Sequence, residues 1–194
     1  MVGSIEYEVP TWDQVYGMLF EQSGKIGKSG YCPDMIVGIA RGGMVPARVL
    51  ADLLGVGQVV VFRIEFYADI AVSGVRPVIT QFLNVDVKGK RVLVVDDVSD
   101  SGQSLKVARQ YLVEAGAVDV KIATLYAKVA TQVMPDFVEK VTSCWIVFPW
   151  EVKETLHSIL QKQRSDKVAA DNTVFAQLLK AILPKGLFEQ TFKT

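Results

Sequence analysis

The stretch that decides the fold is Arg91-Val-Leu-Val-Val-Asp-Asp-Val-Ser-Asp-Ser-Gly-Gln-Ser-Leu105. Its first five residues form a short, almost continuous β-branched run, typical of a central parallel strand buried on both faces. Asp96 and Asp97 follow at the carboxyl end of this strand, where open α/β sheets bind their ligands. The small residues from Ser99 to Ser104 can then turn the backbone so that successive N–H groups point inward as a helix begins. That geometry binds a phosphate.

A turn that merely carries helix caps is the simpler interpretation, because Asp100 and Ser101 are both good capping residues. A cap needs one such side chain, however, whereas this turn offers three carboxylates and three hydroxyls beside Gly102. Like charges crowded at a strand end cost stability unless a cation or a ligand offsets them. We therefore favour a phosphate socket preceded by two carboxylates suited to ribose hydroxyls or Mg²⁺.

Composition narrows the class of protein. The chain has 194 residues, half of them hydrophobic, which suits a single domain with one good core. Equal numbers of acidic and basic residues predict neither a nucleic-acid partner nor a membrane partner. The absence of a signal-peptide pattern and the distant Cys32 and Cys144 predict a cytoplasmic protein with free, buried thiols. The one histidine, His157, lies outside the motifs, so carboxylates must do any proton work.

Strands that alternate with helices predict an α/β fold with a central parallel sheet and flanking helices. The apolar runs predict strands at 35–40, 59–64, 91–95, 120–126 and 143–147. Helical periodicity predicts helices at 11–29, 46–54 and 104–115. Residues 65–85 contain Gly74 and Pro77 and suit a hairpin-like excursion rather than core.

The C-terminal part looks different from the rest. Leu156, Ile159 and Leu160 form one helical stripe, and a second stripe comprises Val174, Phe175, Leu178, Leu179 and Ile182. We therefore expect a core at residues 1–151 and a C-terminal helical extension at 152–194. The extension should pack on the core or on a second subunit, because an isolated helix of this length is marginal in water.

A second loop, Ile39-Ala-Arg-Gly-Gly-Met-Val-Pro46, also follows a predicted strand. Its glycines let the backbone approach a ligand closely, and Arg41 offers a fixed positive charge to phosphate. A tight turn is the commoner explanation of a lone Gly-Gly pair. We favour a ligand loop because a parallel sheet would place it beside the loop after residue 95.

Residues 94–104 closely resemble the phosphoribosyl-pyrophosphate (PRPP) loop of the type I phosphoribosyltransferases, and the resemblance extends over residues 10–151. It implies the type I phosphoribosyltransferase fold with a small hood. It also implies that Asp96 and Asp97 hold the ribose hydroxyls, directly or through Mg²⁺, and that Asp100 accepts a proton from the base. The residues that would bind the 5′-phosphate are Ser101, Gly102, Gln103 and Ser104.

The same resemblance assigns pyrophosphate to Arg41 and Gly42, often with a cis peptide bond before the residue at position 41. Residues 65–79 correspond in position to the mobile loop of the family, and Arg76 is the candidate there to reach pyrophosphate. The serine–tyrosine pair expected in this loop is absent, and Phe66-Tyr67 stands nearby.

Two further segments lie at the ends of predicted strands. Taken alone, the lysine that ends Thr124-Leu-Tyr-Ala-Lys128 is a solvated strand end. The tryptophans of Cys144-Trp-Ile-Val-Phe-Pro-Trp-Glu151, taken alone, are core aromatics. Together they are similar to the base pocket of 6-oxopurine phosphoribosyltransferases, particularly the bacterial xanthine–guanine type. By this resemblance Lys128 donates to the 6-oxo group, Trp145 stacks on the base and the Ile146 backbone meets its edge. Glu151 would help to hold a second Mg²⁺, where an aspartate is the expected residue.

The resemblance predicts a purine salvage enzyme that converts a 6-oxopurine base and PRPP into a nucleoside 5′-monophosphate and pyrophosphate. A homodimer or homotetramer is expected. Adenine is the nearest alternative substrate, since some archaeal adenine enzymes resemble this group and carry C-terminal extensions. We also expect the chain to belong to the archaeal branch of the family. A regulator that senses PRPP and binds nucleic acid is a third possibility, but the chain is neutral and its N-terminus is too short for a winged helix.

Overall fold

The computed structural model describes residues 6–68 and 75–166. By their internal contacts they form two units, one running from Tyr16 to Ser143 and the other made of the residues up to Val15 and from Cys144 onward. The second predicted stripe, at 174–182, lies outside the described residues. The boundary expected at residue 151 stays a prediction.

The larger unit is built on a six-stranded sheet with the order β4-β3-β2-β5-β6-β7. Its parallel strands are β2 (Met35–Ala40), β3 (Val59–Ala68), β5 (Arg91–Ser99), β6 (Asp119–Lys128) and β7 (Phe137–Thr142). Only β4 (Val75–Gln81) among the described strands of this sheet runs antiparallel, as the return strand of a hairpin with β3. The predicted α/β fold with a mostly parallel sheet is therefore confirmed.

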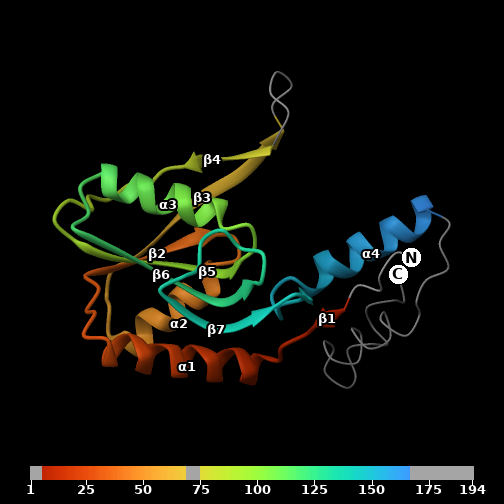
Figure 1. The fold of residues 1–194 in the computed structure, drawn as a ribbon, viewed down its shortest axis with the longest axis horizontal. Helices are drawn as coiled ribbons and strands as arrows, with labels where there is room; N and C mark the ends of the chain where they lie inside the picture. The colour runs from red at the N-terminus through yellow and green to blue at the C-terminus, as the bar shows by residue number, and fades with distance from the viewer. Residues whose placement is uncertain (1–5, 69–74, 167–194) are drawn as a thin grey trace. The chain divides into compact units, whose positions relative to one another are not determined.

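Helices cover both faces of this sheet (Figure 1). Helix α3 (Gln103–Glu114) lies on one face, and α1 (Trp12–Lys28) and α2 (Met44–Leu54) lie on the other. A capping box starts α1: the Gln14 N–H donates to Thr11 Oγ1, and the Thr11 N–H donates to Gln14 Oε1. Gly55, with φ of 67°, ends α2 in the left-handed conformation.

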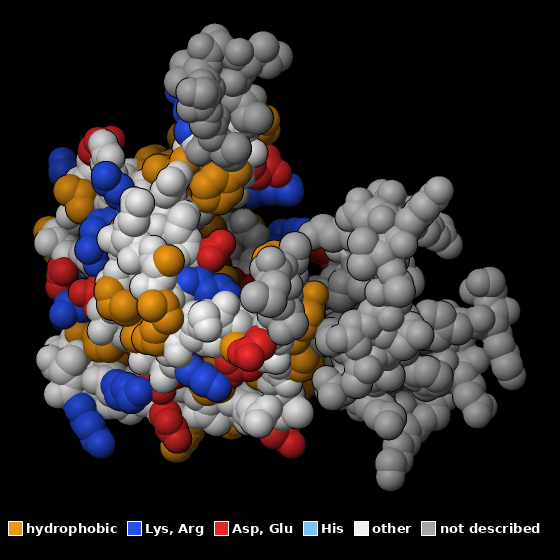
Figure 2. All heavy atoms as spheres, turned by 45° about the vertical axis from the view of Figure 1, so that its right-hand side comes forward, with side chains coloured by type: hydrophobic (Ala, Val, Ile, Leu, Met, Phe, Trp, Pro, Cys, Tyr) orange, Lys and Arg blue, Asp and Glu red, His pale blue; other side chains and the backbone are white. Residues whose placement is uncertain are grey.

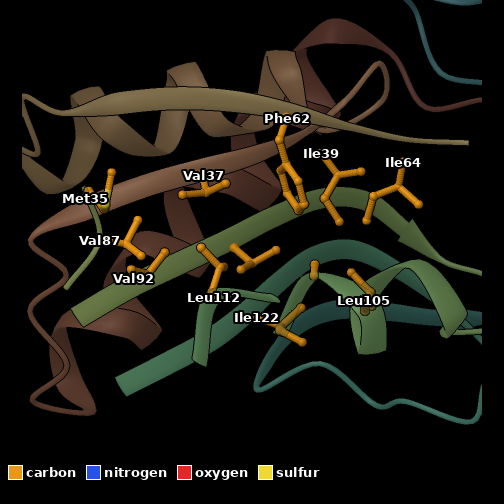
Figure 3. Close-up of a cluster of buried hydrophobic side chains, with 12 residues drawn as sticks. Met35, Val37, Ile39, Phe62, Ile64, Val87, Val92, Leu105, Leu112 and Ile122 are labelled. Carbon is orange, nitrogen blue, oxygen red and sulfur yellow. The ribbon is translucent and has the colours of Figure 1, made fainter. Parts of the chain in front are cut away.

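The core follows from the alternation of side chains along the strands. Figure 3 shows the cluster on the α3 face, where Val37, Ile39 and Val92 gather with Phe62 and with Leu112 of the helix. The intervening residue Ile36 is also fully buried, as a strand covered on both faces requires. This two-sided burial makes β2 and β5 rigid supports for the loops that follow them.

Three details differ from the sequence-based expectations. The strand expected at 143–147 is reduced to β8 (Trp145–Ile146), which pairs with β1 (Tyr7–Glu8) in a separate two-stranded sheet. The edge strand of the main sheet is instead β7. The sequence did not predict this strand, because the charged residues Glu139 and Lys140 interrupt its apolar residues. Cys32 is free, as expected, but exposed rather than buried.

The smaller unit contains β1, β8 and α4 (Val152–Asp166), which confirms that a helix follows residue 151. The rings of Phe148 and Trp150 stack within it at a centroid distance of 4.8 Å, and Trp12 lies 5.7 Å from Trp150. Among the described helices, none has the length and apolar character needed to cross a membrane.

Candidate active site

The two predicted ligand loops come together at the carboxyl ends of β2 and β5, which are adjacent parallel strands. The contact is close at Gly42: a Cβ atom there would overlap the carboxylate of Asp97. A Cβ atom on Gly43 would overlap the carbonyl oxygen of Val95. Both glycines are therefore required by a close approach between the loop and β5. The peptide bond between Ala40 and Arg41 is cis, as the family resemblance implied.

The carboxylates of Asp96 and Asp97 lie on consecutive residues of β5, which continues past its apolar run to Ser99. Asp97 is buried and Asp96 is half-buried, and the Asp97 N–H donates to Asp96 Oδ1 at 3.0 Å. Burial, and then the neighbouring charge of Asp97, raise the pKa of Asp96 well above its ordinary value. The backbone N–H groups of Asp97 and Gly43 act in the opposite direction.

A cation would relieve this repulsion, and carboxylate oxygens are ligands that Mg²⁺ prefers. Two carboxylates fit a magnesium ion that takes its other ligands from water and from a bound substrate. Within residues 6–68 and 75–166, no group of three or more His, Cys, Asp or Glu side chains is arranged to hold a metal. Asp96 and Asp97 would thus supply part of the coordination of a magnesium ion at this strand end.

The turn from Asp100 to Gly102 leads directly into α3. Gly102 is the N-cap residue, with φ of 80°, and no side chain caps the helix there. The nearest substitute is Ser101 Oγ, 3.4 Å from the Gln103 nitrogen, which is a long contact. The capping interpretation of this turn therefore receives little support, whereas a phosphate at the helix N-terminus would meet these N–H groups and the positive end of the helix dipole.

The segment after β6 supports this turn, and sequence reasoning missed it. The Gln132 N–H donates to the Ser101 carbonyl at 3.1 Å, and Ser99 Oγ donates to the Val133 carbonyl at 2.8 Å. Ser99 Oγ also lies 2.8 Å from Thr131 Oγ1. A Cβ atom on Gly102 would lie only 2.7 Å from the Val133 nitrogen, so the segment packs directly on the turn. The hydroxyls at 99 and 131 were the only sequence signal for this contact.

The same segment begins at Lys128, the last residue of β6. The Thr131 N–H donates to the Lys128 carbonyl at 3.0 Å, which closes a tight turn immediately after the strand. Lys128 is half-buried and is paired in register with Thr142 of β7. The structure thus links Lys128 to the turn at residues 100–102 through one short segment, residues 128–133.

Arg76 lies on the hairpin of β3 and β4, paired in register with Tyr67. Since Ala40 is in register with Arg63, Tyr67 is four residues beyond the end of β2, or about 13 Å along the strand. Arg76 is exposed. Its predicted role toward pyrophosphate stays a prediction.

In the smaller unit, Trp145 is 57% exposed while Ile146 is buried. The N–H groups of Trp145 and Val147 donate to the carbonyls of Glu6 and Glu8. Since backbone groups alternate along a strand, those of Ile146 point away from β1. Glu151 Oε1 accepts from the Phe148 N–H at 3.1 Å just before α4 begins. The roles predicted for Trp145, Ile146 and Glu151 toward the base and a second Mg²⁺ stay predictions.

The comparison with known families agrees with this geometry. The model of the phosphoribosyl transferase domain matches residues 17–155. The chain belongs to the phosphoribosyl transferase family. A xanthine-guanine phosphoribosyltransferase from Nitratidesulfovibrio vulgaris is 32% identical to this phosphoribosyltransferase over 159 residues, which are 80% of this chain and 92% of the relative.

Solved structures give the same result. A purine phosphoribosyltransferase from Pyrococcus horikoshii is 40% identical, with a TM-score of 0.69 over 75% of this chain and 94% of that one. A xanthine-guanine-hypoxanthine phosphoribosyltransferase from Helicobacter pylori, 22% identical, shares the fold with a TM-score of 0.67 over 78% of this chain and 99% of that one. The type I fold expected from the sequence is confirmed. The archaeal branch gains no support from these relatives.

Proposed function

We propose that this phosphoribosyltransferase acts in purine salvage and transfers the phosphoribosyl group of PRPP to a 6-oxopurine. The observation that carries the proposal is the close approach of Gly42 to Asp97, beside an α3 N-terminus without a side-chain cap. This arrangement offers a pyrophosphate loop, ribose-binding carboxylates and a phosphate turn side by side. The named relatives act on xanthine and guanine or on purines, which favours a 6-oxopurine as the acceptor.

Each chemical group of the substrate has a proposed partner. The 5′-phosphate binds the backbone and side chains of Ser101, Gly102, Gln103 and Ser104. The ribose hydroxyls bind Asp96 and Asp97, and Arg41 and Gly42 bind the pyrophosphate, with Arg76 reaching it from the hairpin. The base is held by Lys128, by the Trp145 ring and by the Ile146 backbone.

In the reaction, the bond between C1′ and pyrophosphate breaks and a bond between C1′ and the purine nitrogen forms. Positive charge develops on the ribose and negative charge on the leaving group, which Arg41 stabilises. Asp100, exposed in the turn before α3, accepts the proton from purine N7 and so raises the electron density at the attacking nitrogen. Mg²⁺ bound near Asp96 and Asp97, with a second ion near Glu151, would add charge stabilisation on the pyrophosphate side.

Two parts of the proposal concern the protein as a whole. We expect a homodimer or homotetramer and a cytoplasmic location, as for a salvage enzyme that draws on free bases and PRPP. On the face in Figure 2, Lys and Arg side chains are interspersed with Asp and Glu side chains. This face is therefore not the basic face that a regulator of nucleic acid needs, and the chain as a whole has equal numbers of acidic and basic residues, which favours an enzyme.

The decisive experiment mixes the protein with PRPP, Mg²⁺ and one base at a time: guanine, hypoxanthine, xanthine or adenine. Pyrophosphate release and nucleotide formation are measured by enzyme-coupled assay and chromatography. We expect stoichiometric pyrophosphate and monophosphate with at least one 6-oxopurine. Turnover with adenine alone would establish the adenine alternative, and PRPP binding without turnover would establish the sensor.

A further inference from the structure

Helix α1 carries an exposed face with an unusual composition. Its buried side is made by Val15, Leu19 and Ile26. Away from this buried side of the helix, the side chain of Tyr16 is 55% exposed and that of Phe20 is 62% exposed. These two aromatic side chains therefore add exposed apolar surface on successive turns of α1, of the kind that a partner surface covers.

The same helix contains Gly17, Gly24 and Gly27, and the fold gives no internal reason for them. A Cβ atom added at any of the three would have no atom within 4 Å. Glycine inside a helix costs about 1 kcal/mol relative to alanine, so alanine would stabilise an isolated copy of this helix. Gly17 and Gly24, which no intramolecular contact requires, are explained if another backbone approaches this face closely.

The residues of this face also form a symmetric pattern. Asp13, Gly17, Phe20, Gly24 and Lys28 follow one another at spacings of three or four residues. At 100° per residue they lie within an arc of about 80°, on the side of α1 opposite the buried stripe. Asp13 and Lys28 are equidistant from the midpoint between Phe20 and Glu21, and so are Gly17 and Gly24.

We propose that this face, which we call the α1 face, binds the α1 face of a second copy of the chain. The two helices run antiparallel about a two-fold axis near Phe20 and Glu21. Gly17 then lies opposite the partner's Gly24, and Asp13 lies opposite the partner's Lys28. A two-fold interface must be self-complementary, and this arrangement pairs acid with base at both ends of the contact.

Charge selects this arrangement over a parallel one. A parallel pair would place Asp13 against its own copy and Lys28 against its own copy, so that like charges face each other. Antiparallel helices also oppose their dipoles. The glycines let the helix axes come closer than the usual 8–10 Å, and the rings at 16 and 20 can then cover the partner's backbone. The inference does not depend on the enzymatic activity.

The first experiment measures the oligomeric state of the full chain by analytical ultracentrifugation across a concentration series. Wild type should be dimeric, or a larger assembly that contains this dimer. Phe20→Glu should weaken the dimer at least ten-fold. Val113→Glu is the matched control, because Val113 is 55% exposed on α3, away from this face; it should leave the dimer unchanged. A monomeric wild type, or a Phe20→Glu variant as dimeric as wild type, would overturn the proposal.

The second experiment tests the register with charge exchange at two surface positions. Asp13→Lys and Lys28→Asp should each weaken the dimer several-fold, since each places like charges together twice. The double variant Asp13→Lys/Lys28→Asp should restore dimerisation to within about two-fold of wild type. The antiparallel arrangement is wrong if the loss of dimer affinity in the double variant equals the sum of the losses in the two single variants. It is also wrong if neither single variant weakens the dimer. Steady-state activity, measured in parallel, reports separately on the proposed function.

Discussion

Ser99 Oγ, at the end of β5, lies 2.8 Å from Thr131 Oγ1, in the segment that follows β6. The contact joins the strand that carries the acidic pair to the segment that begins at Lys128. Gly102 packs against the same segment. The turn at residues 100–102, which we propose binds the 5′-phosphate, is therefore held from the side by the segment at 131–133.

Thr131→Val tests this support, because valine keeps the shape and removes the hydroxyl. The contact with Ser99 and the 3.3 Å contact from the Val133 N–H to Thr131 Oγ1 are both lost. A hydrogen bond of this kind contributes about 1 kcal/mol, so we expect the KM for PRPP to rise about five-fold. Steady-state kinetics with PRPP as the varied substrate measure it, and kcat should change less than KM.

Thr131→Ser is the control, since it retains the hydroxyl and should restore the KM to near the wild-type value. An unchanged KM in Thr131→Val, or a Thr131→Ser variant as impaired as Thr131→Val, would show that the hydroxyl does not position the turn.

Asp96→Asn should stabilise the protein without ligands and weaken PRPP binding. The raised pKa of Asp96 means that its charged form is disfavoured in the fold, so removing the charge relieves a cost present at neutral pH. A gain of about 1 kcal/mol corresponds to a Tm increase of roughly 2–4 °C. Thermal melts with and without Mg²⁺ and PRPP measure both effects: the baseline Tm rises and the ligand-induced shift shrinks.

The matched control is Asp52→Asn, an exposed carboxyl in a loose pair with Arg48, which should change neither quantity appreciably. A lower baseline Tm for Asp96→Asn would mean that the carboxylate stabilises the ligand-free fold, contrary to this account.

Asp100→Asn should retain PRPP binding and lose turnover. The amide preserves the size of the side chain and cannot accept a proton as the carboxylate does. Loss of a general base costs ~10²–10⁴-fold in rate, so kcat should fall within that range while the KM for PRPP stays within a few-fold of wild type. An unchanged kcat, measured by pyrophosphate release, would remove Asp100 from this role.

Lys128→Ala should impair 6-oxopurines far more than adenine, because only an oxo group needs a donor at that position. A lost charged hydrogen bond is worth about 1.5–3 kcal/mol, or roughly ten- to a hundred-fold in kcat/KM. Competition between hypoxanthine and adenine in one reaction gives the ratio directly. Equal losses with both bases would assign Lys128 a structural role and favour adenine as a natural substrate.

Asp34→Asn should remove part of the acid sensitivity of the fold. Asp34 Oδ1 accepts from Arg91 Nη2 at 2.7 Å, and Asp34 Oδ2 accepts from the Arg91 backbone N–H at 2.8 Å. These hydrogen bonds from Arg91 lower the pKa of Asp34 to about 2, from an ordinary value of 3.8. The stabilisation is therefore fully present above about pH 4 and is lost as the pH falls toward 2.

Urea unfolding of wild type and Asp34→Asn at pH 7, 4, 3 and 2 checks this expectation. The variant should be less stable at pH 7, and the difference in free energy of unfolding should shrink as the pH falls. A difference that is constant with pH would mean that the carboxylate charge plays no part.

Features that depend on neighbours in the chain were determined by the sequence alone. The β-branched run before Asp96 needs only local periodicity to define a buried strand, and the small residues after Ser99 need only their own backbone freedom to form a turn. The glycines at 42 and 43 likewise predicted that the backbone of this loop approaches a neighbouring group closely. The alternation of strands and helices then implied a parallel sheet, and with it the meeting of both loops at one edge.

Contacts between distant segments were decided by the tertiary structure. No local pattern distinguishes β7 from a loop, since Glu139 and Lys140 interrupt its apolar residues, Glu139 is paired with the distant Lys25, and its backbone hydrogen bonds come from β6. The pairing of Trp145 with Tyr7 and the support of Gly102 by the segment at 131–133 have the same origin. The partner of a strand or a hydroxyl is selected by the packing of the whole sheet, and the free energy of that packing is distributed over residues far apart in the sequence.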